Sequence, residues 1–150
     1  MGMMAESQEN PAAIAAITAA YLQQGRALDM LSRGITLIAC IAVFTGVYTG
    51  APLPLTLLAI LVVLFGLAEA YFALRVGFDA ALFGHLAREA FGIVSFDISM
   101  RRLNLMPDDR TGRSMTPRAT GAMVLFRRQA TALLLQVLAI FALPLVALLW

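Results

Sequence analysis

Three long apolar stretches constrain this chain more than any other feature. They cover residues 31–48, 53 to about 74, and 130–150. Each is close to the roughly 20 residues that a helix needs to cross a hydrocarbon core of about 30 Å. The composition agrees, because 61% of the residues are hydrophobic and 13% are charged, whereas soluble domains have about 45–50% apolar and about 25% charged residues. The sequence therefore predicts an all-α integral membrane protein with three transmembrane helices.

The first two stretches are expected to form a tight hairpin, with the third span separate from it. Residues 49–52 carry no charge and contain Gly50 and Pro52, which are typical of a turn. This predicts four parts: a cytoplasmic N-terminal tail and amphipathic helix (1–30), a transmembrane hairpin (31–76), a cytoplasmic helical extension with a basic connector (77–120), and a third transmembrane helix (121–150).

Two residue pairs predict helix starts outside the spans. Asn10 stands before Pro11, and Thr116 stands before Pro117. In each pair the first side chain can cap the free backbone N–H groups, and proline is favoured at the first helical position. We therefore expect one helix before the hairpin and a third long helix that begins well ahead of the membrane.

The basic residues predict the orientation of the chain. All 11 are arginine, and none lies between residues 35 and 74 or after Arg128. Because cytoplasmic loops carry the excess of Lys and Arg, the N-terminus is expected in the cytoplasm and the C-terminus outside, in the periplasm. Arginine without lysine and abundant alanine suggest a GC-rich bacterium, so we expect a multi-pass protein of the bacterial inner membrane.

Small residues recur at helical spacing in both hairpin helices. Such stripes let helix backbones approach closely when lipid removes the ordinary hydrophobic drive. The stripes could pack the two helices of the hairpin on each other or could receive a partner subunit. They comprise Ala42, Gly46 and Gly50 in the first span, and Gly66, Ala70, Ala73, Gly77, Ala80 and Gly84 in and after the second.

Glu69 is the only acidic residue inside a predicted span, and an intramembrane carboxylate suggests a functional site because its unpaired burial is costly. In an antiparallel hairpin, three opposite-charge pairs fall at matched depth. We therefore predict an ion-pair ladder that fixes the register of the hairpin, with a proton or cation site at Glu69 as the alternative. The pairs are Arg33 with Glu69, Asp29 with Arg75, and Arg26 with Asp79.

The chain shows no recognisable catalytic, metal or cofactor motif. His85 is the only histidine and Cys40 the only cysteine, so neither has a second ligand of its own kind. The serines lack the spacing of a nucleophile with its base, and no glycine-rich phosphate loop occurs. We expect no enzyme activity, no cofactor and no metal.

Several arginines flank the third span on its predicted cytoplasmic side. They could bind anionic headgroups or a partner protein, or they could serve only to set the topology. A nucleic-acid partner is not expected, since no basic stripe on a soluble face is predicted. These residues are Arg101, Arg102, Arg113, Arg118, Arg127 and Arg128.

Two functions from different classes are compatible with this pattern. The first is a non-catalytic accessory, assembly or regulatory subunit of a larger inner-membrane complex, with membrane lipids and a larger membrane protein as partners. The alternative is a small transporter or channel that assembles from several copies and uses Glu69. An enzyme acting on lipid is a third possibility, for which the sequence has no motif.

Overall fold

The computed structural model describes residues 10–88, 93–104 and 114–149. These residues form helices and no strands. In chain order the helices are α1 (Pro11–Gln23), α2 (Gly25–Thr49), α3 (Leu53–Ala87), α4 (Ile93–Arg102) and α5 (Met115–Ala147). The all-helical class predicted from the sequence is confirmed.

The helix before the hairpin begins where its capping pair predicts. The Asn10 side-chain oxygen accepts hydrogen bonds from the backbone N–H groups of Ala12 (3.1 Å) and Ala13 (3.2 Å), and Pro11 occupies the first helical position. The helix is nearly continuous with α2, interrupted only at Gln24. α5 begins at Met115, close to the predicted start, with Ser114 rather than Thr116 as its N-cap residue.

The turn of the hairpin lies at residues 50–52, within the predicted segment. Gly50 has a φ of +69° and ends α2 in the left-handed conformation, which costs glycine little because it has no Cβ. The N–H of Ala51 donates to the carbonyl of Gly46 at 2.8 Å. The predicted tight hairpin is therefore present.

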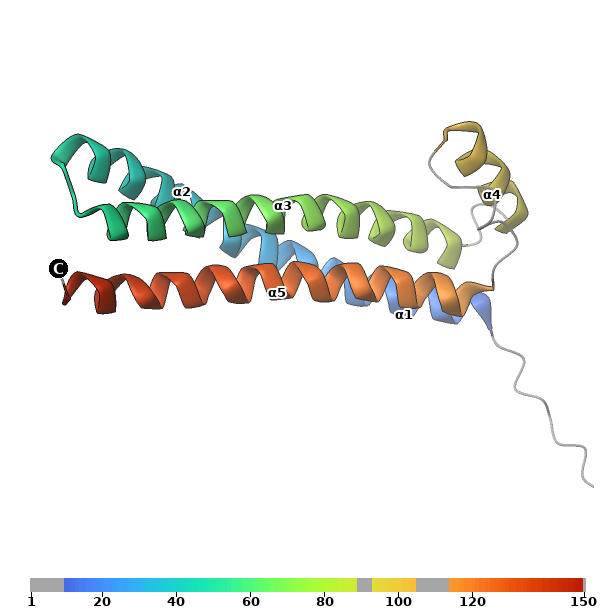
Figure 1. The fold of residues 1–150 in the computed structure, drawn as a ribbon. Coiled ribbons are helices and arrows are strands. Elements are labelled where there is room, and N and C mark those ends of the chain that lie inside the picture. Colours follow the sequence, from blue (N-terminus) through green and yellow to red (C-terminus); the bar gives the residue numbers. More distant parts are fainter. Residues whose placement is uncertain (1–9, 89–92, 105–113, 150) are drawn as a thin grey trace, which may run out of the picture.

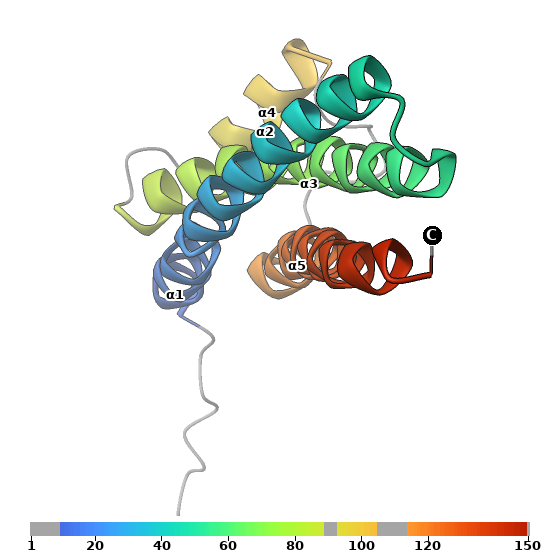
Figure 2. The same ribbon diagram turned by 90° about the vertical axis from the view of Figure 1, so that its left-hand side faces the viewer.

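α3 is the central helix. α1 and α2 pack against it along its length, and α5 packs against another of its faces (Figures 1 and 2). One end of the bundle holds the start of α1, helix α4 and the start of α5, and the other holds the α2–α3 turn and the end of α5 (Figure 1). We call these the charged end and the uncharged end.

Three helical stretches are long and apolar enough to cross a membrane: α1 with α2 (Pro11–Thr49), α3 and α5. At most 22% of the residues in the most apolar window of each are buried inside the structure. α3 has 35 residues, about 52 Å at 1.5 Å per residue, which exceeds a hydrocarbon core of about 30 Å. The predicted three spans are thus supported, and α3 is long enough for its charged end to extend beyond the lipid core.

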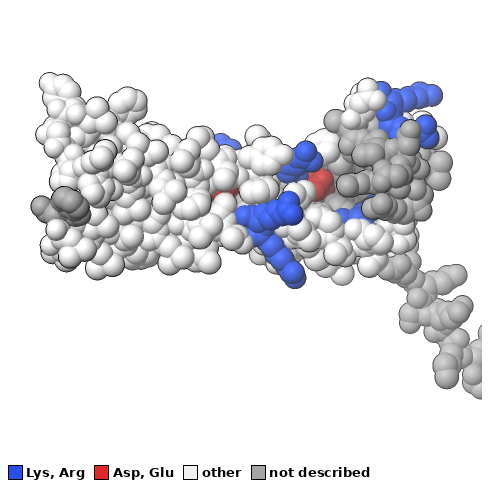
Figure 3. Space-filling view, viewed as in Figure 1, with Lys and Arg blue, Asp and Glu red and all other residues white. Residues whose placement is uncertain are grey.

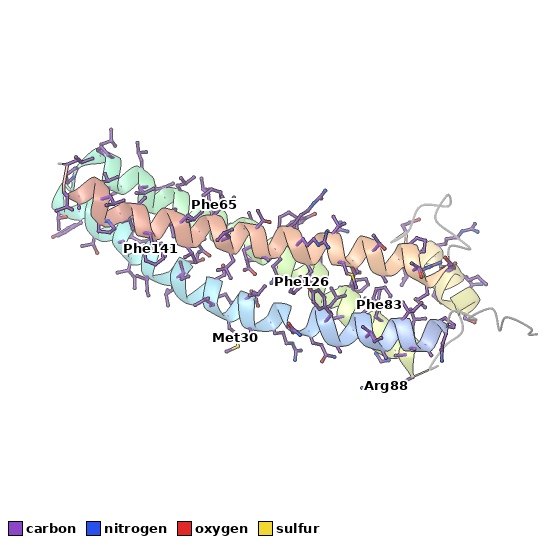
Figure 4. The ribbon with its side chains drawn as sticks, turned by 90° about the horizontal axis from the view of Figure 1, so that it is seen from below. Met30, Phe65, Phe83, Arg88, Phe126 and Phe141 are labelled. Carbon is purple, nitrogen blue, oxygen red and sulfur yellow. The ribbon has the colours of Figure 1, made fainter. Side chains whose placement is uncertain are left out.

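Charge separates the two halves of the surface. Figure 3 shows arginine side chains in the middle and toward the charged end, while the half with the α2–α3 turn shows none on this face. Some apolar side chains of the spans pack between helices, and others point outward. Phe83 and Phe126 lie between helices, whereas Met30 and Phe141 point outward (Figure 4), with exposed fractions of 75% and 68%.

The interior has two apolar cores. The larger lies toward the charged end and joins α1, α3 and α5 through residues such as Leu22, Phe83 and Phe126. The smaller lies toward the uncharged end and joins Ala39, Val62 and Ala139. A layer of polar side chains separates them.

Candidate functional site

The polar layer consists of side chains from the three long helices. Glu69, Gln129 and Gln136 are 0% exposed, and Ser32 is 1% exposed. Thr36 completes the layer on α2 and is half-buried. Buried polar groups are costly unless they are hydrogen-bonded, so the contacts among these side chains decide how the helices meet.

Gln129 joins all three long helices. Its Nε2 donates to Glu69 Oε1 on α3 at 2.7 Å and to the backbone carbonyl of Gly25, at the start of α2, at 2.9 Å. An added Cβ at Gly25 would lie 2.8 Å from Gln129 Oε1. The break between α1 and α2 is therefore the point where the amide of Gln129 approaches the backbone.

Gln136 makes a second junction deeper in the bundle. It lies seven residues after Gln129, two helical turns along the same face of α5. Its Oε1 accepts from Ser32 Oγ at 2.8 Å, and its Nε2 donates to Thr36 Oγ1 at 2.9 Å and to the Ser32 carbonyl at 3.4 Å. α2 and α5 are thus connected by side-chain amide and hydroxyl groups inside the apolar part of the bundle.

Gly66 makes this second junction possible. An added Cβ there would overlap Thr36 Oγ1 and would lie 2.7 Å from Gln136 Nε2 and 3.1 Å from Thr36 Cβ. Any larger residue would displace the Thr36 hydroxyl and the Gln136 amide from these positions. The close approach of the three helices therefore depends on the absence of a side chain at this position.

Two buried oxygens in the layer have no hydrogen-bond partner in the described part of the chain. They are Glu69 Oε2 and Gln129 Oε1. Leaving such groups unpaired costs about 1–3 kcal/mol each, and more for a charged group. Glu69 and Gln129 are therefore the least completely hydrogen-bonded members of the layer, although both are fully buried.

The predicted pairing of Arg33 with Glu69 must be corrected. Arg33 Nε contacts Asp29 Oδ1 at 2.8 Å, one turn earlier on α2, and its side chain is 66% exposed. The face of α3 that carries Glu69 is covered by α5, so the nearest partner of the carboxylate is the Gln129 amide. The guanidinium stays at the surface, where it keeps its hydration and avoids the desolvation penalty of burial.

The other two rungs of the predicted ladder do not form within the described residues either. Neither Asp29 with Arg75 nor Arg26 with Asp79 makes an ion pair. Arg75 instead lies over the ring of Tyr71, 6.0 Å from its centroid. Among the described residues, the polar side-chain contacts of the layer join α2 and α3 each to α5.

The small-residue stripe of α3 is only partly covered by other helices. Gly66 and Ala80 are buried and Ala70, Ala73 and Gly84 half-buried, whereas Gly77 is exposed. An added Cβ at Gly77 or Gly84 would meet no atom within 4 Å.

In α2, Gly46 faces the hairpin, because an added Cβ would lie 3.3 Å from Thr56 Oγ1. Ala42 and Gly50 are exposed. Within the described chain, one of the three positions of the shorter stripe therefore packs against another helix.

Arg118, one of the flanking arginines, forms an ion pair between α4 and α5. Arg118 Nη2 on α5 contacts the Asp97 carboxylate on α4 at 2.8 Å, and both side chains are largely buried. Arg113 lies outside the described residues. The remaining four, Arg101, Arg102, Arg127 and Arg128, are exposed.

A cavity of about 270 Å³ lies between the α1–α2 junction and α3. Two charged residues of α2, Arg26 and Asp29, line it on one side. Ala73, Gly77 and Ala80 of the small-residue stripe line the other side. The cavity therefore lies at the level where the charged half of the surface begins.

The sequence predicted Glu69 as a site residue but not its partners. Gln129, Gln136, Ser32 and Thr36 were overlooked, although two glutamines seven residues apart in an otherwise apolar stretch are a detectable signal. Among the residues that the structure describes, no three His, Cys, Asp or Glu side chains gather as metal ligands do.

No protein-family model, curated protein or solved structure matches this chain. Functional inference therefore rests on the geometry of the bundle.

Proposed function

We propose that this chain is a non-catalytic accessory, assembly or regulatory subunit of a larger complex in a bacterial inner membrane. The carrying observation is that Glu69, Gln129 and Gln136 are fully buried and bonded within one chain. A pathway lined by several copies would need such groups at its surface. Inward-facing polar groups instead suit a structural unit that keeps a fixed shape.

The outer surface of α2 supports a role in docking. Ala42 and Gly50 of its small-residue stripe are exposed, while only Gly46 faces the hairpin. An exposed small residue lets the backbone of a partner helix come close, which is how helices associate in lipid. We infer that the outer half of α2 receives a helix of the partner protein.

The charged end offers a second contact. The Asp97–Arg118 ion pair holds α4 against α5. Exposed arginines follow it on α4 (Arg101 and Arg102) and further along α5 (Arg127 and Arg128). If the positive-inside orientation holds, this end faces the cytoplasm. A partner with an acidic cytoplasmic surface would complement it.

Affinity purification from the native host in mild detergent tests the proposal. We expect a larger membrane protein to copurify in fixed ratio, and Ala42→Phe to abolish the association because a bulky ring blocks close approach. Leu37→Phe is the matched control, since Leu37 is equally a lipid-facing residue of α2. It should leave the ratio unchanged.

A different result would favour the transporter or channel. If the chain purifies only as a homo-oligomer, and if ion flux through reconstituted vesicles is lost in Glu69→Gln, the accessory role is wrong. Glu69 would then act in a pathway, even though it lies inside a single chain.

A further inference from the structure

The cavity beside the α1–α2 junction has features that the accessory role does not use. Its outer wall contains Gln23, Arg26 and Asp29, and its inner wall contains the small residues of α3. An added Cβ at Gly77 would meet no atom within 4 Å, so no side chain covers the α3 backbone at the floor of the cavity. The missing side chain at this position creates room that no other part of the described chain occupies.

The cavity lies at the depth of a lipid headgroup. The part of α3 before Arg75, residues 53–74, covers about 33 Å at 1.5 Å per residue, close to a hydrocarbon core of about 30 Å. Ala73 and Gly77 flank the end of this stretch and line the cavity. A ligand held there would have its polar part at the membrane–water boundary and its apolar part along the uncharged half of the bundle.

The charges lining the cavity specify the ligand further. In the part of the chain that the structure describes, Arg26 has no hydrogen-bond or ion-pair partner. The Asp29 side chain is 17% exposed and contacts Arg33 through Oδ1, which leaves acceptor capacity on the carboxylate. A cationic and an anionic group side by side complement a headgroup that carries both a phosphate and an ammonium.

We propose that this cavity binds a phospholipid headgroup, with Arg26 contacting the phosphate and Asp29 the ammonium. Phosphatidylethanolamine fits best, because its ammonium has N–H donors that phosphatidylcholine lacks. A volume of about 270 Å³ is slightly below the roughly 300 Å³ at which pockets for drug-sized ligands begin. The cavity therefore suits a small headgroup, with the acyl chains outside it.

Native mass spectrometry of the detergent-purified protein, titrated with palmitoyl-oleoyl phosphatidylethanolamine, tests this site. We expect a saturable one-lipid adduct that is weaker for phosphatidylcholine. Arg26→Gln should weaken it by about fivefold, the effect of one basic residue near a headgroup. Gly77→Leu should weaken it at least as much, because the new side chain fills the cavity.

Matched variants keep the test specific. Gly84→Leu makes the same change on α3 at an equally open position outside the cavity, and Arg128→Gln removes an exposed arginine of α5. Both should bind the lipid as the parent does. Ala81→Leu, on another lining residue, replaces Gly77→Leu if that variant does not fold.

Two results would overturn the proposal. Parent-like binding by the folded cavity-filling variant would show that the lipid binds elsewhere. Displacement of the lipid by excess inorganic phosphate would identify a site for free phosphate rather than for a lipid. Retention of the lipid under excess phosphate is the expected result.

Discussion

Gly66 and Gln136 lie where α3 and α5 meet the Thr36 side chain of α2. Gln136 bonds to Ser32 and Thr36 across the bundle, and only a residue without a Cβ leaves room for these contacts. The absence of a Cβ at this position of α3 thus leaves room for the hydrogen bond between Thr36 on α2 and Gln136 on α5. A substitution at Gly66 therefore measures how much these contacts contribute to the free energy of unfolding.

Gly66→Ala should lower the free energy of unfolding by about 1–3 kcal/mol, the usual cost of overpacking a tight interior. The added methyl group would overlap Thr36 Oγ1 and crowd the Gln136 amide. Unfolding of the purified protein by SDS in mixed micelles, followed by circular dichroism, measures the change.

Gly84→Ala is the control for helix propensity. It adds the same methyl group to the same helix where no atom lies within 4 Å. Its stability should stay the same or rise by up to about 1 kcal/mol, because alanine favours helix over glycine. Equal losses in the two variants would mean that Gly66 has no special packing role.

Among the helices, α4 contacts α5 through a partly buried ion pair. The Asp97–Arg118 ion pair joins them at 2.8 Å, and both side chains are shielded from water. Removing one partner would leave the other charge poorly compensated. Loss of this ion pair is therefore expected to loosen α4.

Asp97→Asn should speed amide hydrogen exchange in α4, with its opening free energy lowered by about 1–3 kcal/mol. Exchange in α2 and α3 should not change, since neither contributes to this ion pair. Arg128→Gln, an exposed arginine of α5, serves as control. If α4 exchanges at the parent rate in Asp97→Asn, the ion pair does not hold the helix.

The helices were far easier to predict than their contacts. Apolar stretches and capping pairs located the hairpin turn and helix starts, because backbone hydrogen bonding and lipid impose these locally. The partner of Glu69 could not be predicted in this way. It depends on which face of α3 meets α5. The depth of a residue along the hairpin carries no information about the position of α5.

The whole molecule is polarised along its axis. Arginine side chains lie in the middle of the bundle and toward α4, and the far part of this face, with the α2–α3 turn and the end of α5, shows no charged side chain (Figure 3). Arginine-rich ends stay in the cytoplasm when a bacterial protein inserts. In the orientation predicted from the sequence, the charged end faces the cytoplasm.

Reporter fusions in a bacterial host test the orientation. Alkaline phosphatase fused after Leu149 should be active, because that enzyme folds only in the oxidising periplasm. The same reporter fused after Asn104, beyond α4, should be inactive. The reverse pattern would place the charged end outside the cytoplasm and remove the basis for a cytoplasmic docking surface.

The central claim is that Glu69 is held by Gln129 inside one chain and not by Arg33 across a charged ladder. A double-mutant cycle measures this directly, with Glu69→Leu and Gln129→Leu made singly and together and their unfolding free energies compared. We predict a coupling of about 0.6 kcal/mol, the average for hydrogen bonds between membrane helices, and at most about 1.7 kcal/mol. The parallel cycle of Glu69→Leu with Arg33→Leu should give a coupling near zero. Coupling to Arg33 with none to Gln129 would contradict the account.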